Sequence, residues 1–175
     1  MAEKQFVNIL LNLSSCMNDL LNHIIRYWQW ADNLAWKIMK DLTDEEFNRT
    51  FGDFGNSLRT RYTHLAEDSW EWYTDWTGAD VSEEPDFDTM TRGELFDFIS
   101  EYNKKWENLL VTDSGKTIRV GEEDTMVTIT LPQILFHMNN HATYHRGQIM
   151  LSLRLLGKDT QMTDYVPFRI KTGTD

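Results

Sequence analysis

Cysteine, proline and long apolar runs are all scarce in this chain of 175 residues, and each scarcity excludes a class of protein. The single cysteine, Cys16, rules out an intramolecular disulfide framework and suits a reducing compartment. Only three prolines, with 41% hydrophobic residues and seven tryptophans, argue against disorder. There is no run of about 18 apolar residues and no secretory signal pattern. We expect a single soluble domain, residues 1–175, in the cytoplasm.

Basic residues are also few. The chain has 17 lysines and arginines against 28 aspartates and glutamates, which gives a formal net charge of -11. A protein with this charge is repelled by phosphate backbones and by anionic lipid. We therefore expect neither nucleic acid nor a membrane as a partner.

A sustained alternation of apolar and polar residues is absent, whereas four segments repeat apolar residues at helical spacing. The first predicted helix spans about residues 19–41, and the second spans about residues 57–76. The inward face predicted for the first helix is made of Ile24, Trp28, Ala31, Leu34, Ala35 and Ile38. The face predicted for the second is made of Leu58, Tyr62, Leu65, Ser69, Trp72 and Trp76.

Helix starts are indicated by three capping boxes, at residues 43–46, 91–94 and 130–133. The first opens a short helical turn, the second opens the third long helix, and the last opens the fourth. The fourth helix is predicted to run to Leu156, because Gly157 can take the left-handed conformation that ends a helix.

The connecting segments contain one further element. Residues of about 111–129 include TIRVGEEDTMVTI, which predicts a small β-hairpin turning at GEED. The acidic segment 78–88 is expected to bury little, and the tail 164–175 is expected to anchor through its aromatic residues and then fray. Four amphipathic helices with one long crossover before the last predict an all-α fold, a single antiparallel four-helix bundle.

Three histidines stand four residues apart in HMNNHATYHRGQ, residues 137–148. Extending the apolar stripe of the fourth helix places His141 and His145 on its inward face, where an unpaired polar group costs roughly 1–3 kcal/mol. Two imidazoles four apart on a helix can converge on one cation. For the third ligand we choose His64, beside the inward stripe of the second helix, over His23 near the start of the first.

Each of these assignments has a plainer alternative. A core histidine is most often only hydrogen-bonded, and an H-x-x-x-H pair on a helix also arises by chance. His137 lies about 40° around the helix from His141, and we interpret it as a surface residue or a donor behind the ligands rather than as a fourth ligand.

Four further residues are candidates for catalysis. Glu67 and Asp68 lie three and four residues after His64, where a carboxylate could orient an imidazole or act as a base; the alternative is a solvated acidic face. Tyr144 and Arg146 flank His145 and could bind an anionic substrate group. For Arg146 the alternative is a pair with an acid on a neighbouring helix.

These residues carry a resemblance to a known family. The stretch HMNNHATYHRGQI, followed by LRLLG and TDYVPF, resembles the C-terminal signature of the DinB/YfiT-like superfamily of metal-binding four-helix bundles. The stretches YWQWADNLAWKIMKDLTDEEF and SLRTRYTHLAEDSWEW resemble that family's first two helices. The resemblance implies a divalent ion held by three histidines, here His64, His141 and His145.

The resemblance also implies a function, a thiol S-transferase that joins a low-molecular-weight thiol to a small electrophilic substrate, and a homodimer as one form of assembly. Three neutral histidines leave an open coordination position, as in catalytic zinc sites. There a bound water has a pKa of about 7, or a thiol is held as its thiolate. Zinc is the expected ion, with nickel, iron and manganese as alternatives.

Two other functions remain open. One is a metal-dependent hydrolase that uses bound hydroxide and needs no thiol. The other is a non-enzymatic metal-binding or stress-response protein, which a fourth protein ligand, most directly His137, would favour because it would close the coordination shell.

Overall fold

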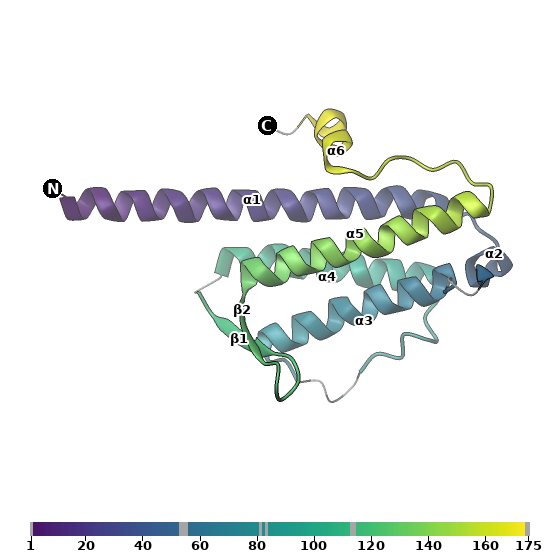
Figure 1. Cartoon of the computed structure of the whole chain (residues 1–175), viewed down its shortest axis with the longest axis horizontal. Helices are drawn as coiled ribbons and strands as arrows, with labels where there is room; N and C mark the ends of the chain where they lie inside the picture. The colour runs from purple at the N-terminus through teal and green to yellow at the C-terminus, as the bar shows by residue number, and fades with distance from the viewer. Residues whose placement is uncertain (1, 53–55, 81, 83, 113–114, 174–175) are drawn as a thin grey trace.

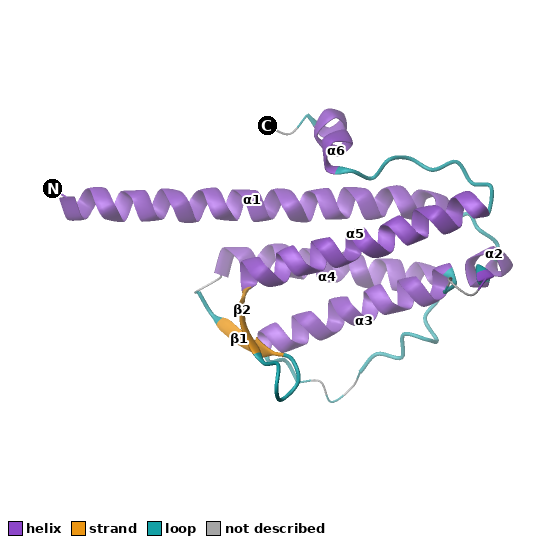
Figure 2. Cartoon of the chain, viewed as in Figure 1, coloured by secondary structure: helices purple, strands orange, loops and turns teal. Residues whose placement is uncertain are grey.

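The computed structural model describes residues 2–52, 56–80, 82, 84–112 and 115–173, with side chains from Cys16 onward. Four long helices form a bundle (Figure 1), as the sequence predicted. They are α1 (Ala2–Met39), α3 (Leu58–Thr77), α4 (Arg92–Thr112) and α5 (Leu131–Leu155). The shorter elements, coloured by type in Figure 2, are α2 (Asp44–Asn48), α6 (Tyr165–Thr172), β1 (Thr117–Val120) and β2 (Val127–Thr130).

The neighbours of each helix decide which side chains can meet. Helix α1 packs against α4 and α5, and α3 also packs against α4 and α5, so α1 and α3 occupy opposite corners of the bundle. Of the long helices that follow each other along the chain, α3 and α4 are neighbours, whereas α1 and α3, and α4 and α5, lie at opposite corners. The arrangement places α3 directly beside α5, the two helices that carry His64 and the three C-terminal histidines.

The prediction that the bundle is antiparallel is wrong for two of its helix pairs. Arg59, at the start of α3, donates to the carbonyl of Met90 just before α4, and Lys116, just after α4, donates to the carbonyl of Trp76 near the end of α3. Helices α3 and α4 therefore run in the same direction, and Figure 1 shows that α1 and α5 do so too. Two long connections make this possible, residues 78–91 and the predicted crossover before α5.

The β-hairpin predicted in that crossover is confirmed. Strands β1 and β2 pair antiparallel, with Thr117 opposite Thr130 and Val120 opposite Val127. The hairpin ends where α5 begins, so it spans the distance between the end of α4 and the start of α5 at the opposite corner.

The predicted capping boxes are present. Thr43 and Glu46 bond each other's backbone N–H at 3.0 and 3.1 Å, and Thr91 and Glu94 do so at 2.7 and 3.3 Å. The N–H of Thr130 donates to Gln133 over 2.9 Å. Gly157 has a φ of 74°, the left-handed conformation predicted to end α5. These three starts and this one stop could be predicted from the sequence because capping is a local interaction.

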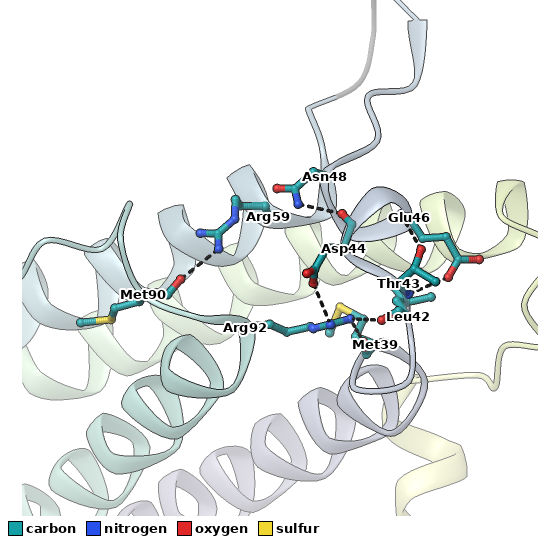
Figure 3. A network of polar contacts seen from close by, with 9 residues as sticks. All are labelled: Met39, Leu42, Thr43, Asp44, Glu46, Asn48, Arg59, Met90 and Arg92. Carbon is teal, nitrogen blue, oxygen red and sulfur yellow. Dashed lines mark hydrogen bonds and ion pairs between the residues drawn. The ribbon is translucent and has the colours of Figure 1, made fainter.

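Arginine side chains join the starts of α3 and α4 to the end of α1 (Figure 3). Arg92 donates to the carbonyls of Met39 and Leu42 and lies 3.3 Å from a carboxylate oxygen of Asp44. Arg59 donates to the carbonyl of Met90 over 3.0 Å. These bonds satisfy carbonyls at the helix end and turns, which have no helical partner.

Several local predictions need correction. Helix α1 begins at Ala2, well before residue 19, since no glycine or proline interrupts residues 2–39. Its buried face uses Ile25 and Met39, one position after the predicted Ile24 and Ile38, which are half-buried. The acidic segment does contribute to the core, because Phe87 is buried there. The tail forms a helix, α6, which docks on α1 through the buried ring of Phe168.

The stripe predicted for the second long helix is largely confirmed. Leu58, Tyr62, Ser69 and Trp76 are buried, and Leu65 and Trp72 are half-buried. Among the described residues, no helix combines the length and apolarity that crossing a membrane requires.

Candidate metal centre

Three histidines from two helices meet between α3 and α5. The imidazoles of His64, His141 and His145 each offer a nitrogen, and these atoms all lie within 4.8 Å of one another. The Nε2 atoms of His64 and His141 are 3.2 Å apart. A tetrahedral ion with bonds of about 2.0–2.1 Å holds its ligands about 3.3 Å apart. The spacing of the two Nε2 atoms therefore suits a shared cation.

The histidines lie at the edge of the buried face of α5 rather than at its centre. The fully buried positions on this part of the helix are Met138, Ala142 and Arg146, whereas His141 and His145 are half-buried. Each of these histidines is one position, about 100° of helical rotation, before a buried residue. The predicted inward orientation is thus shifted toward α3, which leaves the imidazoles accessible to a small molecule.

A carboxylate lies against the same nitrogen atoms. Oδ2 of Asp68 is 2.8 Å from Nε2 of His141 and 3.4 Å from Nε2 of His64, and its side chain is only 19% exposed. Glu67 is placed differently, because its Oε2 is 4.0 Å from Nδ1 of His64 and its side chain is 41% exposed. Glu67 therefore lies at the solvent-exposed edge of the site, whereas Asp68 belongs to the histidine cluster.

His145 is held in the neutral form. Burial, followed by the charges of His141 and His64, lowers its pKa to about 4. Its Nδ1 atom is buried and has no hydrogen-bond partner among the described residues. A neutral imidazole with an unsatisfied nitrogen, in a cluster of two more imidazoles and a carboxylate, is a donor set that fits a divalent cation.

The remaining predicted residues lie outside this cluster. Tyr144 is exposed, with its ring centroid 5.1 Å from that of His145. His137 is also exposed, and its ring lies against Trp72, with centroids 4.9 Å apart. Its nitrogens are not among the three that come together.

Arg146 does not face the site. It is 2% exposed, and its Nη1 donates to Asp32 of α1 over 2.8 Å, while its Nη2 donates to Thr143 over 2.8 Å. The alternative interpretation, a pair with an acid on a neighbouring helix, is the one that the structure shows. The pair links α1 to α5 directly behind the histidines.

A cavity of about 490 Å³ opens on one side of the cluster. His64 and His145 form part of its wall, and the other side, at His141 and Asp68, has only a crevice of about 10 Å³. The histidine cluster is therefore more open to a small molecule on the side of His64 and His145. The rest of the cavity wall comes from Asn56, Arg59, Thr60, Arg61, Thr63, Glu67 and Asp88.

Most of these cavity residues were missed by sequence reasoning. They are polar residues near the start of α3 and in the segment before α4, and no spacing rule links the two. Their shared wall depends on the parallel packing of α3 and α4, which was not predicted.

Comparison with known proteins agrees with this fold. The sequence profile of the DinB family matches residues 17–173. Protein DinB of Bacillus subtilis (strain 168) is 21% identical over 170 residues, which cover 91% of this chain and 99% of that protein. YfiT from Bacillus subtilis, described as "a probable metal-dependent hydrolase with an unusual four-helix bundle topology", matches with a TM-score of 0.55 at 20% identity. That match covers 83% of this chain and 89% of YfiT. The resemblance noted in the sequence is thereby confirmed.

Proposed function

Because the chain belongs to the DinB family, we propose that it is a divalent-metal-dependent enzyme that acts on a small molecule at His64, His141 and His145. The observation that carries the proposal is the convergence of three imidazoles at the wall of a cavity of about 490 Å³. Ligand cavities in proteins commonly measure about 300–1,000 Å³. A metal site that opens on a cavity of this size is typical of catalysis rather than of a purely structural ion.

In this proposal the histidines bind the metal and nearby carboxylates accept a proton. The three imidazoles would hold the ion, and when bound it would supply Lewis acidity that lowers the pKa of a thiol or water reaching it. Glu67 also lines the cavity, and with Asp68 it is a carboxylate placed to accept the released proton. We assign zinc as the ion, because imidazole suits it, with nickel, iron and manganese as the alternatives.

We propose a thiol S-transferase as the reaction. The sulfur of a low-molecular-weight thiol would form a bond to an electrophilic carbon, the leaving group would depart with its bonding electrons, and the thiol proton would pass to a carboxylate. The sulfur must come from a cosubstrate, because the single cysteine, Cys16, is exposed on α1 and is absent from the histidine cluster.

A turnover assay tests this reaction. Tag-free protein is stripped with a chelator and divided, and one half is reloaded with zinc. Each half is then given 1-chloro-2,4-dinitrobenzene with and without 2-mercaptoethanol. We expect thioether formation above the spontaneous rate only when zinc and thiol are both present. Equal rates in stripped and reloaded protein would rule out the metal-dependent transferase.

A hydrolase is the second candidate, favoured by the description of YfiT as a probable metal-dependent hydrolase. It would use water in place of the thiol at the same histidines. The two candidates separate in one experiment, because a panel of ester and amide substrates would be cleaved by the zinc-loaded hydrolase without any thiol.

A non-enzymatic metal-binding protein is the third candidate, and Asp68 is the observation that favours it. Its Oδ2 lies 2.8 and 3.4 Å from two of the presumed ligand nitrogens, close to the separation of about 3.3 Å expected between zinc ligands. If a fourth protein ligand closes the shell, it is Asp68 and not His137, the residue considered from the sequence.

We expect Asp68→Asn to weaken zinc binding about 10–100-fold, because it removes a negative charge beside the cation. Glu67→Gln is the matched control, with the same loss of charge at an exposed carboxylate, and should stay within roughly threefold of the wild type. Zinc affinity is measured by competition with a chromophoric chelator. An Asp68→Asn affinity equal to that of the wild type would show that this carboxylate does not interact with the ion.

Asp68→Asn also distinguishes the enzyme proposal from a non-enzymatic site in which Asp68 fills the fourth coordination position. In the cobalt-substituted wild type, added 2-mercaptoethanol should change the visible absorption, because the enzyme proposal leaves a position for the sulfur. A wild-type spectrum that ignores the thiol, together with an Asp68→Asn spectrum that responds to it, would favour the non-enzymatic candidate.

A further inference from the structure

The cavity beside the histidines contains a charged side chain whose hydrogen bonds are incomplete. Arg61 of α3 is 8% exposed and lines the cavity together with His64 and His145. Its Nη1 donates to Oε1 of Gln148 on α5, and among the described residues this is the only hydrogen bond of the Arg61 side chain. Its Nε is buried and has no partner among those residues.

Burying a charged guanidinium without an ion-pair partner lowers the stability of the folded protein. Arginine remains charged at neutral pH, although burial lowers the pKa of Arg61 below its usual value. No carboxylate lies within ion-pair distance of Arg61 among the described residues, and its contact with Gln148 is to a neutral amide. Buried charges in proteins are normally paired, and an unpaired one calls for an explanation.

A second polar group in the same wall is also unsatisfied. Thr63 is 6% exposed, and its hydroxyl has no hydrogen-bond partner among the described side chains and backbone. A threonine inside a helix usually donates to the carbonyl one turn earlier. The cavity wall thus contains a guanidinium and a hydroxyl that are both buried and both incompletely hydrogen-bonded within the described residues.

The geometry points to a carboxylate on the substrate, and we propose that Arg61 binds it through the Nε and Nη2 edge of its guanidinium. Two parallel N–H groups on that edge match the two oxygens of a carboxylate. Arg61 lines the same cavity as His64 and His145, so its guanidinium lies in the same pocket as the histidine cluster. A carboxylate held by Arg61 would therefore place the rest of a small substrate at the histidine cluster.

The charges around the cavity favour a single negative charge over a phosphate dianion. Glu67 and Asp88 line the same wall and would repel a dianion more strongly than a monoanion. The other arginine of the wall, Arg59, is already engaged, because it donates to the carbonyls of Asp88 and Met90. Arg61 is accordingly the group that selects the substrate class, a small monocarboxylate.

This inference extends the proposed function, and its test begins without metal. The side-chain Nε–H of Arg61 is followed by ¹H–¹⁵N NMR in metal-free protein while 3-mercaptopropionate is added. The neutral match is 3-mercaptopropan-1-ol, which has the same thiol and chain length. We expect a saturable shift of the Arg61 signal with the acid and none with the alcohol. The absence of any selective shift would overturn the inference, and saturation by inorganic phosphate at lower concentration would overturn the preference for a monoanion.

Variants give the second measurement. Wild-type protein should bind the acid at least about tenfold more tightly than the alcohol, as expected for a charge-assisted hydrogen bond. Arg61→Gln should lose this preference and leave binding of the alcohol unchanged. Arg59→Gln makes the same charge change in the same wall and should keep the preference. If Arg61→Gln weakens both probes equally, or Arg59→Gln has the same effect, Arg61 does not select the carboxylate.

Zinc separates the two proposals. If the proposed function is correct, reloading with zinc tightens binding of both thiols, since each sulfur can reach the ion. A carboxylate preference that persists while zinc changes nothing would support Arg61 and contradict the thiol-transferase proposal. Tighter binding of both thiols with zinc, but without a carboxylate preference, would support the thiol-transferase proposal and contradict the role of Arg61.

Discussion

Replacing His141 with alanine is expected to lower the affinity of the protein for zinc by at least about a hundredfold. Loss of a residue that only hydrogen-bonds a metal ligand lowers metal affinity by about 10–100-fold, and the loss of a ligand itself should cost at least as much. His141 contributes the Nε2 atom that lies 3.2 Å from His64 and 2.8 Å from Asp68, so it occupies the middle of the donor set. Without it, only His64 of α3 and His145 of α5 would remain as imidazole ligands. Calorimetric titration of tag-free, metal-stripped protein measures the change.

His137→Ala is the matched control for this variant. It removes the same side chain one turn earlier on α5, where the ring is exposed and lies against Trp72. We expect its zinc affinity to stay within roughly threefold of the wild type. A loss in His137→Ala as large as that in His141→Ala would mean that the metal is bound elsewhere on the helix.

The largest expected effect on stability comes from Arg146. Arg146→Met should lower the free energy of unfolding by about 3 kcal/mol at neutral pH, because it leaves the carboxylate of Asp32 buried without its partner. This value is at the lower end of the roughly 3–5 kcal/mol lost when one partner of a buried ion pair is removed. We choose the lower end because the Asp32 side chain is 17% exposed and can contact some water. Urea unfolding followed by tryptophan fluorescence gives the value.

The deficit of Arg146→Met should shrink as the pH falls from about 7 to about 5. Burial raises the pKa of Asp32, and the charge of Arg146 opposes that rise, so the variant has a still higher folded-state pKa. An aspartate with a raised folded-state pKa costs stability while it is ionised, and the cost disappears as the pH falls through that pKa. A deficit that is constant over this range would contradict the explanation.

The double variant Asp32→Leu/Arg146→Met isolates the cause. Replacing a whole buried ion pair with apolar residues is often neutral or stabilising. We therefore expect the double variant to recover most of the stability lost by Arg146→Met alone. If it is less stable than the single variant, the loss comes from packing around the arginine stem and not from the unpaired carboxylate.

The meeting of the three histidines could be predicted from sequence because its main signals are local. Four-residue spacing places His141 and His145 on one helix face whatever surrounds the helix, and the phase of the apolar stripe turns that face inward. His64 was then the better placed of the two histidines left. The capping boxes and the glycine stop succeeded for the same reason, since each depends on residues within one or two turns.

The remaining features depend on which helices are neighbours and in which direction they run. Asp68 reaches His141 only because α3 lies beside α5, which the order of the helices along the chain does not determine. The cavity wall that includes Arg61 and Asp88 requires α3 and α4 to be parallel, the opposite of the prediction. The sequence left Arg146 between an anionic substrate group and an acid on a neighbouring helix, because its acidic partner, Asp32, is 114 positions away.

Anomalous X-ray scattering at the zinc edge, from crystals of the tag-free protein loaded with zinc, tests the metal centre most directly. We expect one strong peak within bonding distance of Nε2 of His64, Nε2 of His141 and a ring nitrogen of His145. A crystal of His141→Ala grown at the same zinc concentration should show that peak greatly weakened. A wild-type map with no peak between α3 and α5, or with its only strong peak at other side chains, would show that the three histidines do not bind the metal.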